Sequence, residues 1–239
     1  MTPTRLAPRD NRLLTSLHGD IADRLKGRMQ LVELNAGATL YDAGTVLRHV
    51  HFPVTAVVSL VSPLQNGSSV EVAVVGREGV AGVCAFMGGG LALSSAVVQH
   101  AGRAWRMAAA DIAALAQEAP VLMQRLLAYT QFLFAHMAQI SVCHRHHSVA
   151  SQLCRWLLLS LDRVHTNHLV MTHQLISDML GVRRVGVTVA AGQLQRAGLI
   201  EYRRGSIRVL DRKGLEALVC ECYPVVRREF SLLLGKLEE

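Results

Sequence analysis

The feature that most constrains the fold of this chain is a change of pattern near Ala108. Before this residue, runs rich in β-branched residues alternate with turn-forming sequences, as in "AVVSLVS", "QNGSS", "SVEVAVV" and "GREG". Turn sequences recurring roughly every 8 to 12 residues between such runs are typical of an antiparallel sandwich or barrel. After Ala108, apolar residues recur at helical spacing. The sequence therefore predicts an α+β fold, with a jelly-roll-like β domain followed by helices.

The expected strands are the short runs of this first region, "LVEL", "HVHFP", "AVVSLVS", "SVEVAVV" and "SAVVQH". Asn66 and Gly67 lie between the third and fourth of these runs. Both residue types tolerate the positive φ angles of a tight turn. We therefore expect the third and fourth runs to form a β-hairpin.

A long apolar helix is expected from Pro120 to about His146, in "PVLMQRLLAYTQFLFAHMAQISVCHR". Its apolar residues recur three or four positions apart, and phenylalanines widen the apolar surface beyond one stripe. A helix of this kind needs cover on two sides, so we expect it to pack on the β domain and on a second copy of itself. Complete burial inside one domain is the alternative. The residues assigned to dimerisation are Leu126, Leu133, Phe134, Met137 and Ile140.

Composition limits the classes of protein to which this chain can belong. The chain has 239 residues and is 51% apolar, which is enough for two modest domains with their own cores. No apolar run reaches the roughly 18 residues of a membrane span, and "MTPTRLAPRDNRLL" lacks the apolar core of a signal peptide. The five cysteines are spread widely, apart from Cys220 and Cys222, which argues against a disulfide framework. We therefore expect a cytoplasmic protein with no membrane partner.

The stretch "THQLISDMLGVRRVGVTVAAGQLQRAGLIEYRRG" predicts a helix-turn-helix. Thr172 can cap the first helix, and Gly181 can end it in a left-handed conformation. A second helix would begin near Arg183, with Val187 and Leu194 facing inward. The glycines and valines of "VGVTVAAG" favour a strand in isolation, but the caps and the inward positions fit the motif in register.

The tail of this region predicts a wing. "LIEY" and "SIRVL" read as two short strands that turn at Arg204 and Gly205, and Asp211 can cap a further helix. From Arg183 to Lys213 the chain holds eight basic residues and two acidic ones, a net charge of +6 in 31 residues. Such density is typical of a nucleic-acid-binding surface, although a solvated basic face has the same composition.

Ser148 is a plausible N-cap for the helix "VASQLCRWLLLSLDRV" and marks a domain boundary. We therefore divide the chain at 1–119, 120–146 and 147–239, for which the resemblance described next implies a sensor domain, a dimerisation helix and a DNA-binding domain.

The order of these segments resembles the Crp/Fnr family of bacterial transcription regulators. The resemblance rests on "GATLYDAGTVLRHVHFP", "VEVAVVGREGVAG", "CHRHHSVASQLCRWLL" and the helix-turn-helix with its wing. It implies an N-terminal β-roll of the cyclic-nucleotide-binding type, a long dimerisation helix and a C-terminal winged helix that reads the major groove. The function it implies is sequence-specific regulation of transcription by a homodimer on a palindromic operator, with RNA polymerase as a further partner and no enzymatic activity.

The resemblance also assigns roles at the DNA. Arg184 matches the position that reads a base edge, and Arg183 matches a backbone contact. Val185 and Val189 stand where guanine-reading members have a glutamate and a second arginine, so these valines could touch thymine methyl groups instead. The residues expected to hold phosphates are Thr172, Thr188, Arg203, Arg204 and Ser206.

The same resemblance places an effector pocket in the β-roll, at Gly76, Glu78, Gly79, Ser94 and Ser95. Glu78 matches the carboxylate that contacts the ribose in nucleotide-binding members. Ser94 stands where those members have an arginine for the cyclic phosphate, and its loss removes a bidentate charge-assisted contact. We therefore do not expect cyclic AMP as the effector. No cysteine precedes Cys84, so we do not expect an iron–sulfur cluster, and the effector stays unidentified.

An alternative of another class is a β-roll that binds a small molecule or a metal, or an enzyme, with a helical tail for assembly. His49 and His51 lie on one face of a predicted strand, as in a cupin metal site, but no third ligand follows them. "CHRHH" and "CECY" are further metal candidates, for which core and helix-cap roles compete. No catalytic arrangement stands out, and we predict neither catalytic residues nor a metal site.

Overall fold

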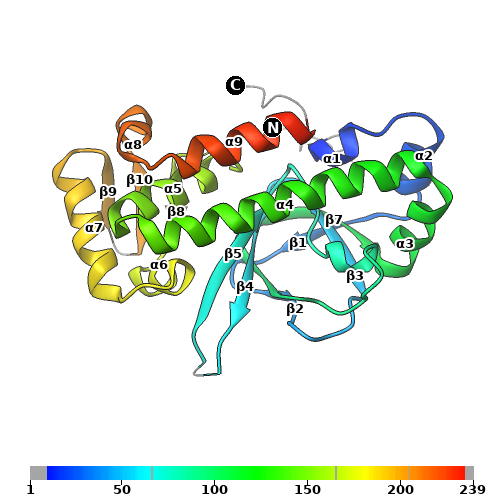
Figure 1. The fold of residues 1–239 in the computed structure, drawn as a ribbon, viewed down its shortest axis with the longest axis horizontal. Coiled ribbons are helices and arrows are strands. Elements are labelled where there is room, and N and C mark those ends of the chain that lie inside the picture. The colour runs from blue at the N-terminus through cyan, green and yellow to red at the C-terminus, as the bar shows by residue number, and fades with distance from the viewer. Residues whose placement is uncertain (1–9, 66, 165, 204, 235–239) are drawn as a thin grey trace. The chain divides into compact units, whose positions relative to one another are not determined.

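A computed structural model describes residues 10–65, 67–164, 166–203 and 205–234 of the chain (Figure 1). The chain forms two compact units. One unit takes Met1–Val58 and Val75–Gln131, and the other takes Ser59–Val74 and Phe132–Glu239. The hairpin segment Ser59–Val74 therefore groups with the C-terminal helices. The three-part division predicted from the sequence stays a prediction.

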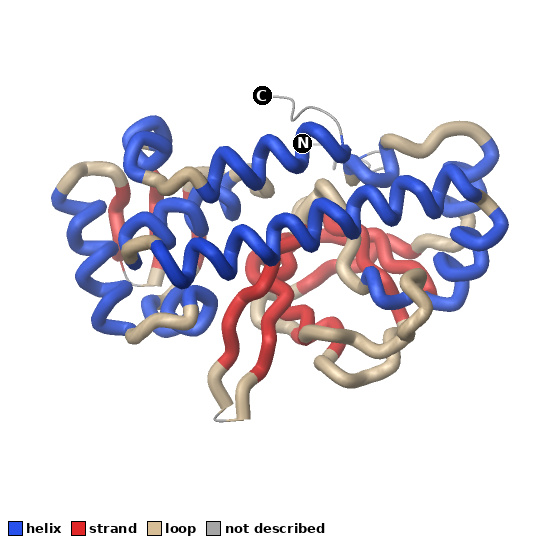
Figure 2. The backbone as a smooth tube through the Cα atoms, viewed as in Figure 1, coloured by secondary structure: helices blue, strands red, loops and turns tan. Residues whose placement is uncertain are grey.

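The β domain holds all five of the predicted strands and two more (Figure 2). Within the described residues, its strands are β1 (Gln30–Leu34), β2 (Thr39–Tyr41), β3 (His49–Pro53), β4 (Val57–Pro63), β5 (Ser69–Val75), β6 (Ser95–His100) and β7 (Gly102–Ala108). They form one sheet in the order β1-β7-β3 and another in the order β2-β6-β4-β5. The neighbouring positions of β4 and β5 fit the predicted hairpin, of which Gly67 has a φ of 81°. Asn66 lies outside the described residues.

Strand β7 holds its sheet together, because it pairs antiparallel with both β1 and β3. It begins at Gly102, where a Cβ atom would lie 2.5 Å from the backbone nitrogen of Ala56. Only glycine allows the two backbones to approach this closely. Ala56 then packs in a small core with Leu34, Val98 and Ala104.

The first unit also holds the short helices α1 (Arg12–Thr15), α2 (Asp20–Lys26) and α3 (Ala109–Glu118). The last of these lies just after Ala108, where the sequence predicted helical spacing. Asn11 caps α1, since its Oδ1 accepts a hydrogen bond from the backbone of Leu14. Its side-chain amide donates to the carbonyl oxygens of Pro53 at 2.8 Å and Gly79 at 2.9 Å. One buried asparagine therefore joins α1 to β3 and to the turn after β5.

The predicted long helix is α4 (Pro120–His146). By length and composition it could cross a membrane, with 44% of its most apolar stretch buried. The core helix of a soluble protein has the same properties, so this feature alone does not indicate a membrane span.

One part of the prediction for α4 is wrong. Leu126, Leu133 and Ile140 are at most 4% exposed within a single chain, so they have no surface left for a second copy. Periodicity identified an apolar stripe correctly, but this stripe faces the chain's own core. The apolar side chains that α4 leaves exposed are Val121, Leu127, Phe134 and Val142.

The C-terminal part holds α5 (Val149–Leu161), β8 (His168–Val170), α6 (His173–Leu180), α7 (Arg184–Arg196), β9 (Ile200–Arg203), β10 (Ser206–Val209), α8 (Arg212–Leu218) and α9 (Cys222–Leu234). Ser148 caps α5 by accepting a hydrogen bond from the backbone of Ser151 at 3.2 Å. Asp211 caps α8 in the same way through Gly214, at 2.9 Å. Both predicted caps are confirmed. β8 and α9 were not predicted, and β8 completes a sheet in the order β8-β10-β9.

Candidate nucleic-acid interface

The first helix of the predicted helix-turn-helix is α6. The Thr172 hydroxyl accepts a hydrogen bond from the backbone of Leu175 at 3.1 Å, and Gly181 ends the helix with a φ of 63°. Ser177 is buried and donates to the carbonyl of Gln174, so no large side chain holds α6 away from its neighbour. A Cβ atom on Gly181 would lie 3.0 Å from Val70 of β5. The turn is therefore closed by a glycine that also packs against the hairpin.

The second helix, α7, has the predicted register. Val187, Ala190 and Leu194 are buried, and this packing outweighs the strand preference of "VGVTVAAG". The opposite face of α7 and its N-cap Arg183 point to solvent, with Val185 66% and Val189 54% exposed. The exposed set on this face is Arg183, Arg184, Val185, Thr188 and Val189.

The start of α7 is well suited to an anion. It has no side-chain cap and no acidic residue in its first turn, and the backbone N–H of Gly186 already donates to the carbonyl of Arg183 at 2.8 Å. The N–H groups of Arg184 and Val185, which precede it, can bind another acceptor. Arg183 and Arg184 add two positive charges at the positive end of the helix dipole. A phosphate of a nucleic acid would find both kinds of donor here.

A stacked pair links α6 to the wing. The ring of His173 lies 4.1 Å from that of Tyr202 with an interplanar angle of 17°, and its Nδ1 is 3.1 Å from the hydroxyl of Thr188. Burial, and then the charge of Arg184, lower the pKa of His173. The imidazole of His173 thus contacts both Tyr202 and Thr188, and the sequence alone did not single out either ring.

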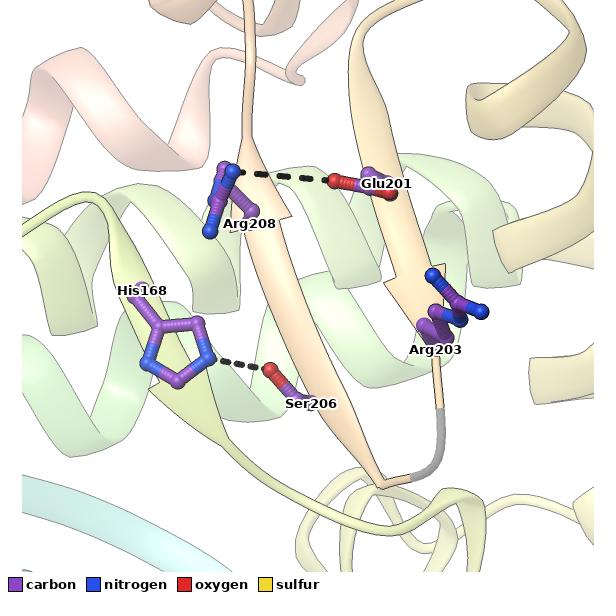
Figure 3. A pocket seen from close by; sticks show the side chains of 5 residues that line it. All are labelled: His168, Glu201, Arg203, Ser206 and Arg208. Atoms are coloured by element: carbon purple, nitrogen blue, oxygen red, sulfur yellow. Dashed lines mark hydrogen bonds and ion pairs between the residues drawn. The ribbon is translucent and has the colours of Figure 1, made fainter.

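The wing consists of β8, β10 and β9, with Ser206 opposite Arg203. Its residues line a hollow of about 460 Å³. Figure 3 shows Ser206 hydrogen-bonded to His168, and Arg208 paired with Glu201 at 3.9 Å. Arg203 is exposed. Arg208 is a basic wing residue that the sequence-based assignment omitted, although its alternation with buried neighbours in "SIRVL" indicates an outward side chain. Arg204 lies outside the described residues.

Four of the five predicted effector residues make contacts within the chain that the structure describes. A carboxylate oxygen of Glu78 accepts a hydrogen bond from the backbone of Gly76 at 3.1 Å, and Glu78 is only 5% exposed. A Cβ atom on Gly79 would lie 1.9 Å from the ring of Tyr129 in α4. The hydroxyl of Ser95 accepts from the backbone of Ala43. The "GREG" turn is thus fixed against α4, and an effector pocket at these residues and the half-buried Ser94 stays a prediction.

His49 and His51 lie side by side with ring centroids 6.5 Å apart. Burial lowers the pKa of His51 to about 4, with further contributions from His49 and Arg106. The cationic Arg106 beside these rings opposes a bound cation. The pKa values of both rings are lowered, which favours the neutral imidazole in each.

A buried polar contact ties the β4–β5 hairpin to α5 within the same compact unit. Glu71 accepts hydrogen bonds from Ser59 at 2.5 Å and from the indole of Trp156 at 3.1 Å. Arg155 and Arg163 lie near enough to affect its charge. This contact joins β5 to α5 through a buried carboxylate.

Comparison with known proteins agrees with this geometry. Residues 31–119 match the family model of the cyclic nucleotide-binding domain, and residues 151–218 match that of the Crp-like helix-turn-helix domain. No curated protein matches the chain.

Several solved structures share the fold. FixK2 from Bradyrhizobium japonicum is 18% identical with a TM-score of 0.66, over 80% of this chain and 98% of that one. A CRP/FNR-family transcriptional regulator from Thermus thermophilus, TTHA1359, is 22% identical with a TM-score of 0.64, and the match covers 79% of this chain and 97% of that one. The c-di-GMP responsive regulator CLP from Xanthomonas campestris is 11% identical with a TM-score of 0.63, over 80% and 98%. With the two family domains in this order and this shared fold, the chain belongs to the Crp/Fnr family of transcription regulators.

Proposed function

We propose that this Crp/Fnr-type transcription regulator binds a palindromic operator in double-stranded DNA as a homodimer. The observation that carries the proposal is the outer face of α7. Its N-terminal turn presents two exposed arginines and free backbone donors, and two exposed valines follow them on the same face. An exposed apolar pair beside cationic side chains fits a major groove, where thymine methyl groups lie next to acceptor atoms.

Within this interface the roles divide by position. Arg184 is inside the first turn of α7 and is the proposed base reader, while Arg183 at the N-cap contacts the backbone. Val185 and Val189 touch thymine methyl groups. Phosphate contacts are assigned to Thr172, Thr188, Arg203, Arg204 and Ser206, and they fix register without reading sequence. We add Arg208 to this phosphate-binding set because it lies exposed on β10.

The second copy is proposed to pack on the exposed side of α4. Leu127, Gln131, Phe134 and Ala138 follow one another at spacings of four, three and four residues, as in the seam of a two-stranded coiled coil. Leu127 is 49% and Phe134 is 54% exposed in the single chain, so each has surface to bury. Met137 is half-buried and borders this seam. A two-fold axis here would present two copies of α7 to successive major grooves, roughly 34 Å apart.

We further propose that the protein acts in the cytoplasm, contacts RNA polymerase and has no enzymatic activity of its own. A regulator of this type must meet both the operator and the polymerase, and its sensor would act by changing how the two DNA-binding domains are held. The effector is not cyclic AMP, because Ser94 lacks the guanidinium that a cyclic phosphate requires.

Selection from a random duplex library tests the proposal. The purified full chain is expected to enrich an inverted repeat whose half-sites are centred about one helical turn apart. The affinity for this site should fall steeply as salt rises, because binding releases counterions. Recovery of sequences no different from the starting library would contradict the proposed function.

A further inference from the structure

Four side chains that could hold a metal converge at the C-terminal end of α4. Cys143 lies in the last turn of α4 and His147 directly follows that helix, while Cys220 and Cys222 lie where α8 gives way to α9. The Sγ atoms of Cys143 and Cys220 are 3.6 Å apart, and the Sγ of Cys222 is 3.4 Å from Nδ1 of His147. All four potential ligand atoms lie within 4.8 Å of one another.

Two of these separations, Cys143–Cys220 and Cys222–His147, are close to the edges of a tetrahedral zinc site. Zinc lies about 2.3 Å from a thiolate sulfur and about 2.0 to 2.1 Å from an imidazole nitrogen, so a tetrahedron has sulfur–sulfur edges of about 3.8 Å and sulfur–nitrogen edges of about 3.6 Å. The two measured separations differ from these edges by only about 0.2 Å. Thiolates of an iron–sulfur cluster bind different iron atoms and must lie further apart. The geometry therefore fits one ion.

The local structure explains why these residues meet. Cys143 and His147 are four positions apart, which places them on one face of a helix end. Cys220 and Cys222 flank Glu221 where α9 begins, so both thiols can face the same point. Cys143 and Cys222 are buried, which excludes water from the centre of the group.

The surroundings provide the hydrogen bonds that such ligands require. Nε2 of His147 is 3.3 Å from a carboxylate oxygen of Glu221, which leaves Nδ1 free to face the other ligands. Gln139 donates to the sulfur of Cys222 at 3.1 Å, and Arg155 donates to the sulfur of Cys143 at 3.2 Å. A carboxylate behind the histidine is the usual partner of a zinc-bound imidazole.

The charge balance of the four side chains and Arg155 also fits a divalent metal ion. Three thiolates and one divalent ion leave a net charge of −1, which the guanidinium of Arg155 offsets at its hydrogen-bonding distance from Cys143. Without an ion, Arg155 donates to a neutral Cys143 thiol, and the buried carboxylate of Glu71 is the other charge it interacts with.

We propose that Cys143, His147, Cys220 and Cys222 bind a single zinc ion. Four protein ligands fill its tetrahedral coordination, so the site is structural and leaves no open position for catalysis. The ion fastens the end of α4 to the start of α9, within the unit that carries the helix-turn-helix. This role is independent of the operator sequence and of any effector.

Cobalt titration of the full chain is the direct test. Reduced protein is stripped with a chelator, and cobalt is added while the visible and near-ultraviolet spectra are recorded. Tetrahedral thiolate ligation predicts intense visible bands and a sulfur-to-cobalt charge-transfer band that saturate at one cobalt per chain and disappear when zinc is added. A stripped chain that unfolds and then refolds with cobalt at this stoichiometry gives the same answer.

Variants identify the ligands. Cys143→Ser and Cys222→Ser should each abolish the charge-transfer spectrum, whereas Cys84→Ser, in the β-roll unit, should leave it unchanged. Glu221→Ala offers a variant that keeps the fold, because this side chain is 72% exposed, and it should weaken zinc binding about 10- to 100-fold. Three results would each overturn the proposal. They are an octahedral cobalt spectrum, a cobalt spectrum that is unchanged in Cys222→Ser, and a Cys143–Cys220 disulfide in a protein that binds no zinc once it is reduced.

Discussion

The carboxylate of Glu71 accepts a hydrogen bond from the indole of Trp156, with Oε1 and Nε1 3.1 Å apart across 85 positions of sequence. Burial raises the pKa of Glu71 to about 7, although Ser59, Arg155, Arg163 and Trp156 oppose the shift. A glutamate of β5 with a pKa near neutral pH thus joins the β4–β5 hairpin to α5, the first helix of the predicted DNA-binding domain.

The stability of this unit should depend on pH through Glu71. Because its folded pKa lies above the ordinary value of 4.5, the folded state holds the proton more tightly than the unfolded state. This contribution is fully present below about pH 4.5 and is lost as the pH rises through about 7, by an amount on the order of 3 kcal/mol. Glu71→Gln should flatten the dependence of the urea midpoint on pH in this window.

The exposed Glu33→Gln in β1 serves as the matched control, since it should leave the pH profile of the unfolding midpoint unchanged. If Glu71→Gln and the unmodified chain lost stability equally between pH 5 and pH 8, Glu71 would not be the group that titrates.

A methyl group at Gly79 should disturb the contact between the "GREG" turn and α4. The new Cβ atom would lie 1.9 Å from the Tyr129 ring, whereas one on Gly89 meets nothing within 4 Å. Gly79→Ala should therefore lower the free energy of unfolding by roughly 1 to 3 kcal/mol, as overpacked cores do, and Gly89→Ala should change it by less than about 0.5 kcal/mol. Chemical denaturation of the two variants provides the comparison, and equal stability would show that the turn can move away.

The elements that the sequence predicted best are those whose ends are determined by a few neighbouring residues. Thr172 and Gly181 mark both ends of α6 by capping chemistry that depends on a few neighbouring residues. Ser148 and Asp211 act in the same way at α5 and α8. The register of α7 followed from the inward positions of Val187 and Leu194, although the glycines and valines of "VGVTVAAG" favour a strand in isolation.

The elements that the sequence missed depend on distant partners. β7 carries Arg103, Trp105 and Arg106 without a clean alternation, and it becomes a strand because β1 and β3 pair with it on both sides. The His173–Tyr202 stack joins residues whose proximity follows only from the packing of α6 against the wing. The assignment of Leu126 to a dimer contact failed because periodicity identifies an apolar face but not which surface covers it.

A charge at the centre of the proposed seam on α4 should separate the dimer. Phe134→Glu places a carboxylate where two copies of the helix would meet, and burial of two such charges is strongly unfavourable. Sedimentation should show a monomer for this variant. Val121→Glu lies on the same helix at a 61% exposed position outside the seam and should remain dimeric. A dimer of unaltered affinity for Phe134→Glu would place the subunit contact elsewhere.

Cyclic AMP should not act on this protein. Calorimetric titration is expected to show no binding, and operator affinity should be the same with and without the nucleotide, because no guanidinium stands at Ser94. Micromolar affinity for cyclic AMP together with stronger operator binding would refute this prediction.

Base reading by α7 is the central claim, and binding-site selection with two arginine variants tests it most directly. Arg184→Ala should cost roughly 1 to 3 kcal/mol of binding free energy and relax the preference at one base pair in each half-site. Arg203→Ala, in the wing, should weaken binding to all sequences alike and reduce the salt slope by about one. An unchanged base preference for Arg184→Ala, or an altered one for Arg203→Ala, would contradict the account.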